Sequence, residues 1–385
     1  MTTVELTATA MASDGRAVAR EESGRVAFVS GALPGERVRV ALVAEHRRFA
    51  DAVAQEVLDP SPERVDAACP HVAEGCGGCQ WQHLTPAGQL RLKERIIADS
   101  LSRIGRVGDL PLRPSVVLDP WRYRTSLRAG VVDGRAGLRR SRSNDLVPVE
   151  GCLVAHPLLV ELLEGRRYPG ADEVMLRCGA RTGERLAVTD PPSTQADVPP
   201  DVRTDWLHEL AAGRRWRISA GSFFQGRPDG ADALAGLVGA AAGELGSPGK
   251  AVDLYSGVGL FAGVLAAAGW ATIAVEGSAA AVSDARRNLE DLAVRVVRSD
   301  VLEWKPAGAD LVVADPSRSG LGRSGVAVVG ATGAERVVLI SCDAASLGRD
   351  AGLLIASGYR LVAVTPVDLF PQTFRVEVVS VFDRV

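Results

Sequence analysis

From residue 251 to its end, the chain alternates short apolar runs with segments of helical character, and this alternation restricts the possible folds more than any other feature. The runs AVDLY, TIAVE, VRVVR, DLVVA and RVVLIS have the length and β-branched content of buried strands. Helical patterns at 262–268 and up to Asn288 lie between them. Strands that alternate with helices form parallel sheets, so the sequence predicts a doubly wound α/β domain.

The loops that follow these strands carry glycines and acids. The first loop, Asp253-x-x-x-Gly257-x-Gly259, lacks the third glycine of a dinucleotide-binding fingerprint, which disfavours NAD. Glu276 ends the second strand, where a carboxylate can accept hydrogen bonds from ribose hydroxyls, and Asp300 and Asp315 end the third and fourth. Any one of these acids could be a helix N-cap. Together they suit a nucleoside without phosphates, and we expect S-adenosylmethionine to be the cofactor.

A cysteine ends the fifth strand. Read alone, Cys342 is best explained as a small buried apolar residue. Beside a methyl donor it becomes a candidate nucleophile, because C5 of uracil attacks a methyl sulfonium only after a thiolate has added to C6. The proton left on C5 then needs a base. Glu377, at the start of the apolar run VEVVSVF, is the candidate base, and a surface acid on an edge strand is the alternative.

A second group of cysteines has the spacing of a metal site. Cys69, Cys76 and Cys79 fall within eleven residues, with glycines between the last two, and Cys152 can supply a fourth thiolate from a distance. Four thiolates hold an iron–sulfur cluster. A structural zinc site and a set of unligated thiols are the alternatives.

The rest of the chain indicates a soluble RNA-binding protein. Short strands and turns predict a small β-barrel over residues 1–58. Between residues 91 and 142 there are 13 Lys and Arg against 5 Asp and Glu, with Trp121 and Tyr123 among them, a composition that suits RNA. The first residues have neither a basic start nor a long apolar core, so we expect them not to be a signal peptide, and the apolar run at 260–270 is too short to span a membrane. We expect a cytoplasmic monomer that does not bind membranes.

Eight blocks occur in the order found in one enzyme family: GALPGERVRV, CPHVAEGCGGCQWQHL, QLRLKERI, SFFQ, DLYSGVGLF, DPSRSGL, ISCDAASLGRD and DLFPQTFRVE. The chain therefore resembles, over almost its whole length, the bacterial and archaeal RNA 5-methyluridine methyltransferases that carry a TRAM barrel and a [4Fe–4S] cluster.

The resemblance implies three domains. These are a TRAM or OB-like barrel (1–58), a mixed central iron–sulfur domain with a basic RNA-binding surface (59–215), and a Rossmann-like methyltransferase domain (216–385). It also implies a structured RNA substrate, with ribosomal RNA favoured over transfer RNA. The implied residues are, for the cluster, Cys69, Cys76, Cys79 and Cys152; for S-adenosylmethionine, Gln225, Tyr255, Glu276 and Asp315; for the nucleophile and base, Cys342 and Glu377.

Several positions depart from the commonest pattern of the family. Asp343 replaces an asparagine and Arg375 replaces a histidine, changes that we expect to affect the RNA target more than the reaction. The other departures are Ser256, Leu260 and Ser317. Two further hypotheses are a non-catalytic RNA-binding protein with a decayed transferase fold, and a radical iron–sulfur enzyme, whose usual CxxxCxxC spacing is absent here.

Overall fold

The computed structural model describes residues 3–193 and 195–385, and it begins with a closed five-stranded barrel. The strands follow one another around the barrel in the order β1-β2-β3-β5-β4, and closure leaves the sheet without a free edge. Alternate residues point inward, where small side chains such as Ala17, Ala27 and Val38 form the core. The barrel predicted from the sequence is confirmed. Its strands are β1 (Thr3–Met11), β2 (Ala17–Arg20), β3 (Val26–Ser30), β4 (Arg37–Glu45) and β5 (Phe49–Asp59).

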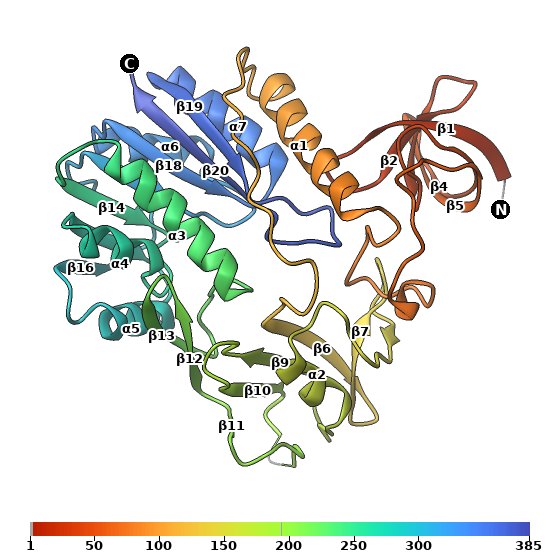
Figure 1. The fold of residues 1–385 in the computed structure, drawn as a ribbon, viewed down its shortest axis with the longest axis horizontal. Helices are drawn as coiled ribbons and strands as arrows, with labels where there is room; N and C mark the ends of the chain where they lie inside the picture. Colours follow the sequence, from red (N-terminus) through yellow and green to blue (C-terminus); the bar gives the residue numbers. More distant parts are fainter. Residues whose placement is uncertain (1–2, 194) are drawn as a thin grey trace.

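The central part of the chain forms a mixed six-stranded sheet and a separate hairpin (Figure 1). The sheet has the order β11-β10-β9-β6-β7-β8, and helix α2 packs against it. Its elements are β6 (Ser126–Val132), β7 (Arg135–Arg139), β8 (Leu146–Val147), α2 (Pro157–Glu164), β9 (Glu173–Cys178), β10 (Arg185–Asp190) and β11 (Val202–Arg203). A 3-10 turn, η1 (Pro70–Val72), and helix α1 (Pro86–Arg103) precede the sheet, and the hairpin of β12 (Trp206–Ala211) and β13 (Arg214–Ser219) follows it.

The C-terminal part is a seven-stranded sheet of order β16-β15-β14-β17-β18-β20-β19. The first five strands are parallel, which confirms the doubly wound sheet, and β20 runs antiparallel between β18 and β19. The strands are β14 (Lys250–Leu254), β15 (Ala271–Glu276), β16 (Val294–Arg298), β17 (Leu311–Ala314), β18 (Arg336–Ser341), β19 (Tyr359–Pro366) and β20 (Val378–Arg384). The helices are α3 (Pro228–Gly243), α4 (Leu260–Ala267), α5 (Ala279–Asn288), α6 (Gly322–Ala331) and α7 (Ala344–Ala356).

Helices cover both faces of this sheet. Apolar side chains of α3, α4 and α5 form one cluster with the strands, and those of α1, α6 and α7 form the other. Helix α1 therefore packs on α7 of the C-terminal part, although it precedes the central sheet (Figure 1). It lies so close to α7 that a Cβ atom added at Gly348 would be 2.4 Å from the Ser100 carbonyl oxygen. No described helix combines the length and the apolar character needed to cross a membrane.

Candidate active site

Strand order and direction bring Cys342 and Glu377 to the same edge of the sheet. Cys342 follows the last residue of β18, and Glu377 precedes the first residue of β20. Because β18 and β20 are antiparallel neighbours, with Ser341 opposite Val378, the end of one strand lies beside the start of the other. Asp315 follows β17, the next strand across the sheet, so the three side chains share one edge. In open α/β sheets this edge is where ligands bind.

Burial controls the charge of these three groups. It raises the pKa of Glu377 well above its usual range, and the negative charge of Asp315 adds to this effect. Burial also raises the pKa of Asp315 to about 7, against the hydrogen bond that the carboxylate accepts from Gln225. The pKa of Cys342 rises to about 11, first through burial and then through Glu377 and Asp315, while Arg318 opposes the shift. A cationic ligand would therefore be bound favourably in this acidic, partly dehydrated edge.

The glycine loop after β14 is held against the end of β15. The backbone N–H of Gly257 donates to Glu276 Oε2 at 2.9 Å, and that of Ser278 donates to Glu276 Oε1 at 2.7 Å. Tyr255 and Gly257 have φ angles of 60° and 55°, so the loop turns sharply beside the carboxylate. Glu276 retains lone pairs on both oxygens, because a carboxylate accepts about four hydrogen bonds.

Two polar atoms under this loop have no hydrogen-bond partner among the described residues. They are Asp253 Oδ1 and Ser256 Oγ, on side chains that are both buried. The other oxygen of Asp253 accepts from the Ala262 N–H at 2.8 Å, at the start of α4. Burial raises the pKa of Asp253 well above its usual range. Unpaired buried polar atoms are costly, and they mark this loop as a place where a ligand or water completes the bonding.

Gln225 approaches the acids from the segment that follows the β12–β13 hairpin. Its Nε2 donates to Asp315 Oδ2 at 3.2 Å, and the side chain is buried. Phe223, two residues earlier, is 67% exposed, which is unusual for a phenylalanine. The SFFQ block is recognisable in the sequence, but the exposure of this ring is not.

Asp300 lies at the margin of the candidate active site. Its side chain accepts from the Leu302 N–H at 2.8 Å and is exposed, and no hydrogen bond joins it to another residue of the site. Its charge nevertheless reaches Tyr255, whose pKa is raised first by burial and then by Asp300.

The segment from 367 to 377, which leads to Glu377, is fixed by residues far away in the sequence. Lys93 donates to Asp368 Oδ1 at 2.7 Å and to the Phe370 carbonyl at 2.9 Å, and both side chains of the pair are buried. Gln89, one turn earlier on α1, exchanges two hydrogen bonds with Gln372 at 2.7 and 2.9 Å. Sequence reasoning did not identify these two helix residues. Their spacing of four, on a buried helix face, is the signal that could have found them.

Asp343 and Arg375, which depart from the family pattern, both lie close to Cys342. Asp343 is the N-cap of α7, and its Oδ1 accepts from the Ser346 N–H at 2.8 Å. Asparagine and aspartate are equivalent in such a cap. Arg375 is half-buried among Arg318, Cys342 and Asp343; burial lowers its pKa, and the neighbouring Arg318 adds to this.

The four candidate ligand cysteines line one small cavity. Cys69, Cys76, Cys79 and Cys152 meet there, with Arg124 beside them. All four thiols are free. Burial raises the pKa of Cys79 to about 11, against the positive charge of Arg124. Within residues 3–193 and 195–385, no group of three or more His, Cys, Asp or Glu is arranged to hold a metal ion. The convergence of four thiols fits the ligand set of a cluster, which spreads them over several iron atoms.

Known proteins with similar sequences include RNA methyltransferases. Residues 2–54 match the TRAM domain family. The chain is 36% identical to an uncharacterised RNA methyltransferase of Streptomyces avermitilis, over 97% of this chain and 96% of the relative. It is 32% identical to a 23S rRNA (uracil(1939)-C(5))-methyltransferase of Alkalilimnicola ehrlichii, over 99% and 96%.

A solved structure shares the fold over nearly the whole chain. It is that of the Pyrococcus abyssi tRNA (uracil-54, C5)-methyltransferase in complex with S-adenosyl-L-homocysteine. The TM-score is 0.76 at 23% identity, with 98% of this chain and 99% of that chain covered.

Proposed function

The chain belongs to the family of RNA uracil-C5 methyltransferases that carry a TRAM domain, and from this premise we propose that it methylates C5 of a uridine in structured RNA. S-adenosylmethionine supplies the electrophilic methyl group. Ribosomal RNA is favoured as the substrate, because two relatives that are each 32% identical to this chain are 23S rRNA (uracil(1939)-C(5))-methyltransferases. The observation that carries the proposal is the meeting of Cys342 and Glu377 at adjoining ends of β18 and β20, beside Asp315.

Cys342 is the proposed nucleophile and Glu377 the proposed base. The Cys342 thiolate adds to C6 of the uracil, and the negative charge that develops on C5 and O4 makes C5 nucleophilic. C5 then takes the methyl group, and S-adenosylhomocysteine is the leaving group. Glu377 takes the proton from C5, the C5–C6 double bond forms again, and the C6–S bond breaks to release the thiolate. The positive charge of Arg318 stabilises the thiolate that begins and ends this sequence. The target base must first leave its stack to reach the edge.

The methyl donor would be held by the loops at the carboxyl ends of β14 to β17. We propose that Glu276 binds the ribose hydroxyls, that Gly257 allows the backbone to approach, and that Asp315 and Gln225 hold polar groups of the donor. Tyr255 would flank the same site, and Asp300 would face the adenine. The exposed ring of Phe223 suits stacking on an unpaired base.

An RNA that contains 5-fluorouridine tests the covalent step. Fluorine on C5 cannot be removed as a proton, so the wild-type protein with S-adenosylmethionine should remain joined to the RNA through a denaturation-resistant bond. Cys342→Ala should form no adduct and incorporate no labelled methyl group into uridine-containing RNA. Cys178→Ala is the matched control, because Cys178 lies buried at the end of β9 and should leave both reactions intact. A wild-type protein that binds RNA but methylates none would favour the non-catalytic alternative.

We propose further that Cys69, Cys76, Cys79 and Cys152 hold a [4Fe–4S] cluster with a structural role. The shared cavity supports this assignment. Anaerobically purified protein should be brown and contain about four iron and four sulfide per chain, and Cys69→Ser should lose both colour and iron. A colourless preparation that contains zinc would contradict the assignment.

A further inference from the structure

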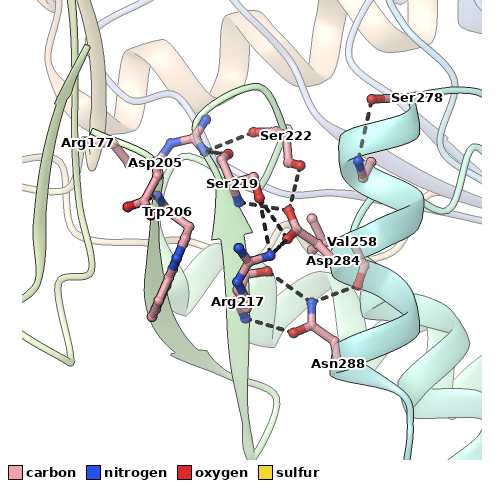
Figure 2. Close-up of polar contacts among 11 residues, drawn as sticks. Arg177, Asp205, Trp206, Arg217, Ser219, Ser222, Val258, Ser278, Asp284 and Asn288 are labelled. Atoms are coloured by element: carbon pink, nitrogen blue, oxygen red, sulfur yellow. Dashed lines mark hydrogen bonds and ion pairs between the residues drawn. The ribbon is translucent and has the colours of Figure 1, made fainter. Parts of the chain in front are cut away.

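Helix α5 carries a buried acid that holds the segment leading to Gln225. Asp284 is fully buried, and both of its carboxylate oxygens accept hydrogen bonds from the end of β13 and beyond (Figure 2). Oδ2 accepts from the Ser219 N–H at 2.7 Å and from the Ser222 hydroxyl at 2.6 Å. Oδ1 accepts from the Ser219 hydroxyl at 2.8 Å and from the Arg217 guanidinium. Ser222 stands three residues before Gln225, so Asp284 fixes the base of that segment.

One turn further along α5, Asn288 holds the glycine loop. Its Nδ2 donates to the Val258 carbonyl at 3.1 Å and to the Arg217 carbonyl at 3.0 Å, and its Oδ1 accepts from the Arg217 N–H at 2.8 Å. Val258 lies between the two glycines of the loop that contacts Glu276. Asn288 therefore joins this loop to the same hairpin strand that Asp284 holds (Figure 2).

The central sheet adds a third support. Arg177 of β9 is buried and donates to the Ser222 carbonyl at 2.8 Å. The segment 219–225 is thus bonded at Ser222 from both sides, by α5 and by the central sheet (Figure 2). Gln225, at the end of this segment, donates a hydrogen bond to Asp315 at the edge of the C-terminal sheet.

We propose that Asp284 and Asn288 are positioning residues for the methyl donor, and that they act by fixing Gln225 and the glycine loop relative to Glu276, which ends the strand before α5. This inference rests on the proposed function. Neither side chain is assigned to contact the donor. Losing either one should weaken donor binding, because loops that are not held in place must be ordered during binding.

Asparagine cannot replace Asp284 in either orientation. Each carboxylate oxygen faces a donor that cannot reverse its role: the Ser219 N–H on one side and the Arg217 guanidinium on the other. The amide nitrogen of Asp284→Asn would therefore face a donor whichever way it turned. This makes the substitution a nearly isosteric test of the hydrogen bonds.

Titration calorimetry with S-adenosylhomocysteine on the purified holoenzyme measures the effect. We expect the dissociation constant of Asp284→Asn to rise about tenfold or more, and that of Ser222→Ala to rise several-fold. In steady-state assays the KM for S-adenosylmethionine should rise, while the KM for RNA and the kcat at saturating donor stay near wild type. A purely structural defect would instead lower the fraction of competent sites, and would leave the affinity of the remaining sites unchanged.

Asp291→Asn is the matched control. Asp291 pairs with Arg214 of the same hairpin at 2.6 Å, but it is exposed and bonds neither loop. It should leave donor affinity within twofold of wild type. A folded Asp284→Asn protein with wild-type affinity, or an equal loss in Asp291→Asn, would overturn the inference. If Asp284→Asn does not fold, an unchanged affinity in Ser222→Ala overturns it. A wild-type protein that does not bind S-adenosylhomocysteine would refute the proposed function instead.

Discussion

At the scale of single residues, burial shifts the pKa values of the acidic groups at the candidate site. Glu377 and Asp315 are acids whose pKa values are raised by loss of water, and their charges in turn help to raise the pKa of Cys342 to about 11. A base with a raised pKa is well suited to accept a proton from carbon near neutral pH. The same two acids disfavour the Cys342 thiolate, and the positive charge of Arg318 opposes this effect.

Glu377→Gln should separate methyl transfer from the release of product. Without a carboxylate, the C5 proton stays in place after methylation, and Cys342 cannot be expelled. We expect turnover to fall by about 10²–10⁴, with a methylated protein–RNA adduct accumulating on ordinary uridine RNA. Denaturing gels with labelled S-adenosylmethionine measure both. Glu303→Gln, at an exposed position, is the control. Normal turnover by Glu377→Gln would show that another group removes the proton.

Asp315 should make the unfolding free energy decrease as pH rises. Its pKa is about 7 in the folded protein, against 3.8 as the ordinary value, so the folded state binds its proton more tightly than the unfolded state. The resulting stabilisation is present at low pH and is lost between about pH 4 and pH 7. Urea unfolding measures the free energy of unfolding at about pH 5 and pH 8. The decrease between these two pH values should be smaller for Asp315→Asn than for wild type, by a few kcal/mol at most. Equal losses in the two proteins would contradict this assignment.

At the scale of elements, α1 supports the segments next to both Cys342 and Glu377. It packs closely on α7, which follows Cys342, through the contact at Gly348. It also bonds the segment before Glu377 through Gln89 and Lys93. The helix thus contacts both the helix that follows Cys342 and the segment before Glu377, although it belongs to a distant part of the chain.

Lys93→Met should destabilise the protein and slow the reaction. It leaves the carboxylate of Asp368 buried without its cation, at a cost of about 3–5 kcal/mol. We also expect a lower kcat, because the segment before Glu377 loses two bonds. Unfolding by urea and initial rates at saturating substrates measure the two effects. Arg91→Met, at an exposed position of the same helix, should cost less than about 1 kcal/mol. Similar losses in the two variants would show that the buried pair has no special role.

At the scale of the whole molecule, the barrel touches the catalytic segment directly. A Cβ atom added at Gly15, in the turn after β1, would lie 2.5 Å from the Phe374 side chain, three residues before Glu377. Trp81 connects the two regions: its indole N–H donates to the Gly15 carbonyl, and its backbone N–H donates to the Gln372 carbonyl, both at 3.0 Å. The barrel is therefore packed against the segment that leads to Glu377.

Gly15→Ala should lower kcat more than Gly24→Ala. Both glycines have left-handed φ angles, 81° and 83°, so both substitutions carry a backbone cost of about 1–2 kcal/mol. Only Gly15 has a neighbour within 4 Å, the ring of Phe374, and moving that ring should disturb Glu377. Initial rates at saturating RNA and donor, alongside thermal unfolding, distinguish the cases. Equal kcat values in the two variants would show that this contact does not position the base.

The sequence by itself determined the elements and the types of residue at their ends. Apolar periodicity predicted the barrel strands and the doubly wound sheet, and residue types at strand ends pointed to Cys342, Glu276 and Asp315. These signals are local, because a strand or loop is encoded within a few neighbouring residues. The spacing of Cys69, Cys76 and Cys79 was equally readable, and the structure places them with Cys152 around one cavity.

Only the tertiary structure decided which distant residues meet. The antiparallel insertion of β20 beside β18 puts Glu377 next to Cys342, and nothing in the run VEVVSVF specifies that neighbour. The packing of α1 on α7 and the bonds of Asp284 to Ser222 and of Asn288 to the glycine loop were likewise invisible in the sequence. Such contacts join segments far apart along the chain, and they are selected by the free energy of the whole packed core rather than by any local pattern.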